Sequence, residues 1–109
     1  DLFSAKDFRT WAATKIFFEC LRDLGYIAEE KQNAKNLLTA YDAAADGLGN
    51  TRTVCRNYYV HPVIPEAYAD GSIVPYFEKV DRIKPKSGSH LSRTEMVIKE
   101  MLANYEVNI

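Results

Sequence analysis

Apolar residues recur at intervals of three and four along most of this 109-residue chain, and glycine or proline interrupts each run. This spacing places apolar side chains on one face of an α-helix, whereas a half-buried strand would show alternation. The first run ends at Gly25 and the second at Gly47, and no stretch of sequence alternates convincingly. The sequence therefore predicts a mainly α, small multi-helix domain. The apolar face of its first helix is expected to contain Phe8, Trp11, Ala12, Phe18, Leu21 and Leu24.

Capping residues, glycine and proline indicate where each helix should begin and end. Ser4 is expected to cap the first helix, and Ser92 with Glu95 has the spacing of a capping box for the last. The stretch 29–36 is polar almost throughout, so we expect the start of the second helix to face solvent. The expected helices span residues 4–24, 28–47, 51–58, 65–68, 72–80 and 92–106, with a polar linker over 84–90.

Composition limits the class of protein. The chain is 47% hydrophobic and 27% charged, which is ordinary for one globular domain over residues 1–109. No apolar run approaches the roughly 20 residues of a membrane span, and the first residues lack the basic and apolar blocks of a secretory signal. Cys20 and Cys55 lack metal-ligand spacing. We expect them to be small buried side chains in a reduced, cytoplasmic and monomeric protein.

The charge is unevenly distributed. A net charge of −1 is low for a protein that binds a polyanion such as DNA, because duplex affinity comes largely from Lys and Arg. Residues 79–93 nevertheless contain five cations and one acid, whereas residues 19–46 contain six acids and three cations. The sequence is therefore compatible with one cationic face, but this chain alone does not have the charge of a complete DNA clamp.

Residues 48–68 are the stretch best suited to carry chemistry. A polar turn precedes a short segment that ends in Tyr58 and Tyr59, and the charged residues between positions 50 and 62 are Arg52 and Arg56. A tyrosine in cationic surroundings can act as a nucleophile toward a phosphate ester. The alternative is structural, because tyrosines often bury the ring and keep the hydroxyl at the edge of a core.

The spacing between Asn50 and Tyr59 constrains how this stretch can fold. In one continuous helix, nine residues would separate the two by about 13 Å and place them on nearly opposite faces. For both side chains to reach one phosphate, the helix must break or turn before Tyr59. Pro62 makes such a distortion reasonable, since the residue before a proline is disfavoured in the α region. Asn50 or Thr51 is expected to cap this helix.

Three separate segments together resemble the catalytic domain of type IB DNA topoisomerases, in particular the bacterial, poxvirus-like branch. They are Lys-Asp-Phe-Arg-Thr-Trp at 6–11, Leu-Gly-Asn-Thr at 48–51 and Tyr-Val-His-Pro at 59–62. Their order and approximate spacing agree with the family, and the resemblance covers residues 3–70. Tyrosine recombinases share this architecture but usually have His where Lys6 stands, so Lys6 favours the topoisomerase branch.

The resemblance implies a C-terminal part of the catalytic domain, acting on duplex DNA without metal or cofactor. Tyr59 would attack the scissile phosphate and form a 3′-phosphotyrosyl intermediate, Arg9 would bind the non-bridging oxygens, and Asn50 would donate a further hydrogen bond. Religation after strand rotation would relax supercoils at a bacterial nucleoid. Further DNA contacts are expected from Lys6, Thr51, Arg52, Arg56 and His61.

The second arginine and the general-acid lysine of the family lie upstream of the Arg9 segment, in a part that this sequence does not contain. The chain is therefore expected to need that upstream part and to be inactive alone. Two alternatives remain open at this point. One is a tyrosine recombinase or integrase fragment, and the other is a non-enzymatic helical DNA-binding module whose tyrosines are structural.

Overall fold

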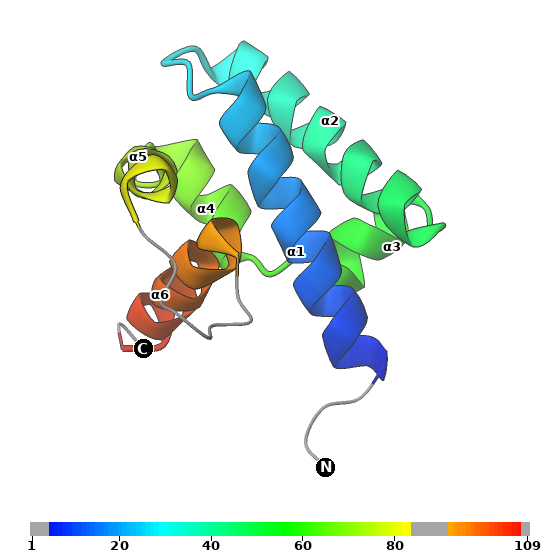
Figure 1. Cartoon of the computed structure of the whole chain (residues 1–109). Helices are drawn as coiled ribbons and strands as arrows, with labels where there is room; N and C mark the ends of the chain where they lie inside the picture. Colours follow the sequence, from blue (N-terminus) through cyan, green and yellow to red (C-terminus); the bar gives the residue numbers. More distant parts are fainter. Residues whose placement is uncertain (1–4, 84–91, 108–109) are drawn as a thin grey trace.

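The computed structural model describes residues 5–83 and 92–107, and within them it is almost entirely helical (Figure 1). The mainly α prediction is confirmed, and no strand occurs in the described residues. The helices are α1 (Ala5–Leu24), α2 (Glu30–Leu48), α3 (Arg52–Val54), a π-helical segment (Cys55–Tyr59), α4 (Val63–Asp70), α5 (Val74–Arg82) and α6 (Arg93–Val107). No described helix is long and apolar enough to cross a membrane.

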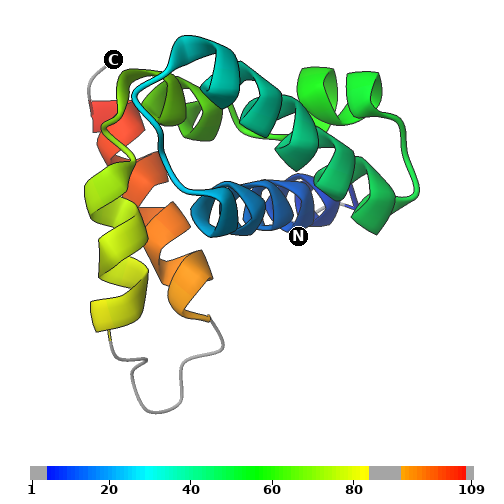
Figure 2. The ribbon, with the colours of Figure 1, turned by 90° about the horizontal axis from the view of Figure 1, so that it is seen from above.

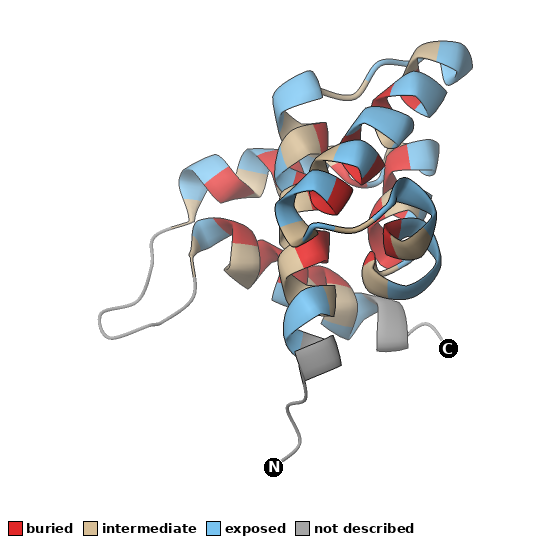
Figure 3. Ribbon diagram, turned by 90° about the vertical axis from the view of Figure 1, so that its right-hand side faces the viewer, coloured by how far each residue is buried: buried red, intermediate tan, exposed pale blue. Residues whose placement is uncertain are grey.

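The long helix α1 is covered from two sides. In Figures 1 and 2, α2 returns antiparallel along it, while α5 and α6 lie on its other side. Phe17 meets Tyr41 of α2 at a ring-centroid distance of 4.5 Å, and Phe18 meets Phe77 of α5 edge-on at 5.2 Å. Neighbouring residues of α1 thus anchor opposite layers of the core, and Figure 3 marks the buried residues, which every described helix except the short α3 contains.

The start of α2 departs from its predicted exposure. Asn33 and Asn36 are 7% and 4% exposed, although this polar stretch was expected to face solvent. The Asn36 Nδ2 donates to the Tyr68 hydroxyl at 2.9 Å, and that hydroxyl donates to the Gly25 carbonyl at 2.6 Å. The Asn33 Oδ1 accepts from the Ile27 amide at 3.2 Å. The prediction was wrong for these two residues, because their amides supply partners for buried groups of the α1–α2 loop and α4, whereas Glu29, Glu30, Lys31, Ala34 and Lys35 are exposed as expected.

The predicted capping box of α6 is confirmed and extended. The Glu95 amide donates to the Ser92 Oγ at 3.2 Å, and the Ser92 amide donates to the Glu95 Oε1 at 2.9 Å. The other carboxylate oxygen, Oε2, accepts from the Trp11 Nε1 at 2.6 Å. One side chain thus caps α6 and fastens it to α1. The expected cap at Ser4 and the linker over 84–90 lie outside the described residues.

The remaining boundaries follow the proline and glycine signals closely. The helix expected from Pro65 begins earlier, at Val63, and it ends at Gly71 in the left-handed conformation with φ 83°. The piece expected over 72–80 is α5, which has a proline in its first turn. Cys55 is buried as predicted, whereas Cys20 is only partly buried, and burial raises the pKa of both thiols.

Candidate functional site

The Tyr59 segment begins as a normal helix and then widens. The Thr51 Oγ1 accepts from the Val54 amide at 3.2 Å, so Thr51 is the N-cap. Cys55–Tyr59 then form a π-helical turn, and the Val60 amide donates to the Cys55 carbonyl at 2.8 Å. Val60 is extended, with φ −83° and ψ 122°. Such π-helical turns are rare and often occur at functional sites.

The distortion predicted before Tyr59 takes the form of this π-helical turn and not of a break in the helix. The helix stays continuous through Tyr59 as a widened turn and ends immediately after it, because the change to extended backbone occurs at Val60, two residues before Pro62. Asn50 lies outside this helix. Its amide donates to the Ala45 carbonyl at 2.9 Å, which assigns its backbone to the C-terminal cap of α2 rather than to the next N-cap.

Thr14 joins α1 to the end of the Tyr59 segment. Its Oγ1 accepts from the His61 amide at 3.1 Å and lies 3.4 Å from the Tyr59 carbonyl oxygen, to which it donates. The Thr14 residue is only 2% exposed. Sequence reasoning did not identify this residue. The available signal was a small polar residue on the helix of Arg9, between the buried Ala13 and Phe17.

The two adjacent tyrosines differ sharply in environment. Tyr58 is 65% exposed, whereas Tyr59 is partly buried and packs against the hydrophobic core. A nucleophile benefits from a fixed approach to its target, because orientation contributes much of the rate. The constrained Tyr59 therefore suits that role better than the freely exposed Tyr58.

Arg9 lies near the N-terminal end of α1 with its side chain exposed. It makes no ion pair or hydrogen bond within the described residues. In Figure 1, α3 lies near the N-terminal half of α1, and the π-helical segment that follows α3 contacts α1. Arg9 precedes Thr14 by five residues, which is about 7.5 Å along the axis and about 140° around it. The structure thus places the Tyr59 segment against α1, the helix that carries Arg9.

The two arginines expected to contact DNA already have partners inside the protein. Arg52 forms a bidentate pair with Asp42 through two hydrogen bonds of 2.7 Å, and these bonds lower the pKa of the Asp42 carboxyl. The Arg56 guanidinium carbon lies 6.0 Å from the centre of the Tyr41 ring. Burial raises the pKa of Tyr41, and the charge of Arg56 offsets part of that effect. Both arginines remain exposed.

His61 has a structural partner on its imidazole. The Nδ1 accepts from the Val63 amide at 3.1 Å, at the start of α4. An acceptor nitrogen carries no proton, so this atom is not a proton donor in the observed arrangement. The side chain of Lys6, another expected DNA contact, lies outside the described part of the structure.

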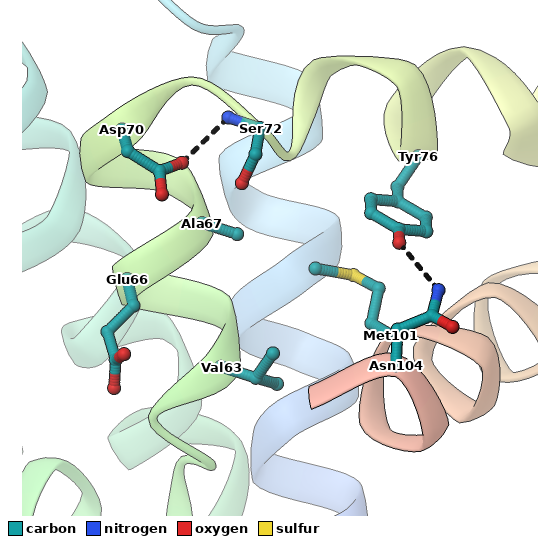
Figure 4. Close-up of a pocket in the computed structure, with 8 residues that line it drawn as sticks. All are labelled: Val63, Glu66, Ala67, Asp70, Ser72, Tyr76, Met101 and Asn104. Atoms are coloured by element: carbon teal, nitrogen blue, oxygen red, sulfur yellow. Dashed lines mark hydrogen bonds between the residues drawn. The ribbon is translucent and has the colours of Figure 1, made fainter. Parts of the chain in front are cut away.

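The pocket of Figure 4 lies elsewhere, where α4, α5 and α6 meet. It has a volume of about 220 Å³ and combines apolar walls from Val63 and Met101 with the carboxylates of Glu66 and Asp70. None of the expected catalytic residues lines it. No cluster of three or more potential metal ligands occurs among the described residues. This pocket is therefore separate from the Tyr59 segment.

Comparison with known proteins gives one family. The model described as eukaryotic DNA topoisomerase I, catalytic core, matches residues 1–86, from α1 through α5. This range includes Arg9, Asn50 and Tyr59 and ends before α6. A search of curated proteins found no match to the chain. Because the matched range exceeds half of the 109 residues, the chain belongs to the type IB topoisomerase family, that of the eukaryotic DNA topoisomerase I catalytic core.

Proposed function

We propose that this chain is the C-terminal part of a type IB topoisomerase catalytic domain and that it cleaves and religates one strand of duplex DNA. The observation that carries the proposal is the position of Tyr59, which ends a π-helical turn pinned by Thr14 to the helix of Arg9. The family match makes DNA topology the general setting. The bacterial, poxvirus-like branch is a further part of the proposal and rests on Lys6 and the motifs at 48–51 and 59–62.

The proposed reaction exchanges one ester for another. The Tyr59 oxygen attacks the scissile phosphorus, the bond to the 5′ oxygen breaks, and a 3′-phosphotyrosyl link conserves the bond energy. The phenol loses its proton, and the departing 5′ oxygen gains one. Arg9 suits the non-bridging oxygens, because a guanidinium stays charged and donates to two oxygens at once. Asn50 would donate one more hydrogen bond to a phosphate oxygen, where negative charge develops.

The proposed partners are duplex DNA and the upstream part of the same enzyme. Part of the cationic segment 79–93 is engaged within the chain, since Lys79 pairs with Glu100 at 2.5 Å. The Arg22–Asp81 pair involves the acid of that segment and none of its cations. We therefore propose that residues 1–109 form one domain that completes a DNA clamp with upstream residues, and that those residues supply the second arginine and the general-acid lysine. No cofactor takes part, and a monomer at the bacterial nucleoid is the proposed setting.

A suicide DNA substrate tests this function directly. The chain would be extended by its natural upstream sequence, and covalent adducts that survive denaturation would be counted. Tyr59→Phe should abolish the adduct, whereas Tyr58→Phe, the same chemical change one residue earlier, should retain it. The unextended 109-residue chain should give no adduct and no robust plasmid relaxation.

Other outcomes identify the alternatives. An adduct that forms only at defined recombination sites would indicate a tyrosine recombinase. DNA binding without any adduct, unchanged in Tyr59→Phe, would indicate a binding module. An adduct that persists in Tyr59→Phe and disappears in Tyr58→Phe would show that the neighbouring tyrosine is the nucleophile.

A further inference from the structure

We infer that Thr14 is a positioning residue, whose buried hydroxyl fixes the backbone where the chain leaves the π-helical turn and thereby sets the direction of the Tyr59 side chain. The inference rests on the proposed function, in which Tyr59 is the nucleophile. It assigns a role to a side chain that does not itself touch the DNA.

The first support is the backbone requirement at this helix end. The Tyr59 carbonyl is among the last carbonyls of the helix, which lack partners within it, and the His61 amide lies just beyond the end. Buried groups of this kind need a partner from elsewhere in the protein. The Thr14 hydroxyl serves both, because a hydroxyl can accept from the amide at 3.1 Å and donate toward the carbonyl at 3.4 Å.

The second support is the length of backbone that the two hydrogen bonds of Thr14 hold in place. The two contacts flank Val60, the residue at which the backbone changes from helical to extended. Val60 is itself 7% exposed, so its side chain and both flanking backbone groups are held. With these groups fixed, the helix end at Tyr59 has little freedom to rotate. Because Thr14 and Arg9 belong to α1, the two hydrogen bonds of Thr14 also fix the nucleophile segment relative to the proposed phosphate-binding arginine.

The effect on the rate of DNA cleavage depends on how far the phenolic oxygen of Tyr59 moves when the backbone rotates. The phenolic oxygen lies at the far end of the side chain, so a small backbone rotation displaces it more than it displaces the backbone. A displacement of about 1 Å from the reactive geometry can cost on the order of 100-fold in rate. We therefore expect that loss of the Thr14 hydroxyl slows cleavage by about 10- to 100-fold, in line with that figure.

The test compares two substitutions in the upstream-extended chain. Thr14→Val keeps the branched shape without the hydroxyl, and Thr14→Ser keeps the hydroxyl without the methyl group. The single-turnover rate of cleavage and the DNA dissociation constant would be measured on the suicide substrate. Thr14→Val should be slower by the expected factor with DNA affinity unchanged, while Thr14→Ser should stay within a few-fold of the wild type.

A purely structural role gives a different pattern. Thr14→Ser leaves a void, so its melting temperature should fall while its rate is retained, and this separates rate from stability. Equal rates in Thr14→Val and the wild type would overturn the inference, as would equal slowing in Thr14→Val and Thr14→Ser. Should Thr14→Val not fold, Thr14→Ala is the variant without a hydroxyl for the same comparison with serine.

Failure of the proposed function is recognised separately. A wild-type extended chain that forms no adduct would overturn both the function and the inference. A normal Tyr59-dependent adduct together with a normal rate in Thr14→Val would overturn only the inference.

Discussion

Tyr68 lies at the centre of the polar network that joins α1, α2 and α4, so Tyr68→Phe tests how this network stabilises the fold. The Tyr68 side chain is fully buried. Its hydroxyl donates to the Gly25 carbonyl at 2.6 Å and accepts from the Asn36 Nδ2 at 2.9 Å. Phenylalanine would retain the ring contacts with Tyr26 and Phe77, so that only the hydroxyl is removed.

The expected loss in the free energy of unfolding follows from the hydrogen bonds that Gly25 and Asn36 would lose. A typical intramolecular hydrogen bond contributes about 1 kcal/mol net, and a buried donor left without a partner costs about 1–3 kcal/mol. Asn36 is 4% exposed, so water cannot easily replace the lost hydroxyl there, whereas Gly25 is only partly buried. The expected loss in the free energy of unfolding is therefore about 2–3 kcal/mol, dominated by Asn36.

Urea unfolding followed by far-UV circular dichroism would measure this loss. With a slope of about 1.5 kcal/mol per molar, a loss of about 2 kcal/mol lowers the midpoint by about 1.3 M. Tyr26→Phe is the matched control, because its ring packs against Tyr68 and its hydroxyl makes no hydrogen bond within the described residues. The control should change stability by less than about 0.5 kcal/mol.

Two results would refute this reasoning. The first is a loss in Tyr68→Phe no larger than in Tyr26→Phe. The second comes from a double-mutant cycle with Asn36→Ala: if the losses simply add, the two side chains are not coupled, and the hydrogen bond between them contributes nothing measurable.

Two further predictions concern α6 and the turn after α4. The hydrogen bond from the Ser92 amide is the main cause that lowers the pKa of Glu95. Because its folded pKa lies below the unfolded value of about 4.3, the stabilisation is full well above that pH and is lost as pH falls through the folded pKa. The stability difference between wild type and Glu95→Gln should therefore shrink from pH 7 to pH 3 in urea titrations, and an equal difference at both pH values would exclude this role of the carboxylate. Gly71→Ala should lower stability in thermal unfolding by more than Gly25→Ala, which should lose about 1–2 kcal/mol for its left-handed φ of 80°. At Gly71 a Cβ would also lie 3.2 Å from the Tyr26 ring, and equal losses would show that this contact costs nothing.

Local signals predicted the helices well, but they did not predict burial within them. The capping box of Ser92 and Glu95 and the stop at Gly71 involve residues close in sequence, so their pattern was visible. Asn36 was expected in solvent because its neighbours are polar, yet its partner Tyr68 is 32 residues away. Periodicity identifies which residues can be exposed. It does not show which polar groups find a partner across the core.

At the candidate site too, the sequence identified the candidate residues but did not predict how the backbone places them. Its motifs singled out Arg9, Asn50 and Tyr59, whose roles stay predictions until the adduct is tested. The proline signal indicated a distortion before Tyr59, but it did not predict that the distortion is a π-helical turn over Cys55–Tyr59. A π-helical turn differs from an α-helical one by the register of its hydrogen bonds, here from Val60 to Cys55. That register depends on where the chain is held after the turn, which the local sequence does not specify.

The side chain that holds the chain after the turn is Thr14 of α1. The geometry of the Tyr59 segment therefore depends on the helix that carries Arg9. Thr14 donates to a carbonyl 45 positions away and accepts from an amide 47 positions away, so nothing in its own neighbourhood marks it. Trp11, two residues after Arg9, is bonded to Glu95 of α6, beyond the residues that the family model matches. The helix that carries the proposed phosphate-binding arginine is thus fixed at Thr14 by the nucleophile segment and at Trp11 by α6. Its position relative to the scissile phosphate would therefore depend on contacts outside the three motifs that identify the chemistry.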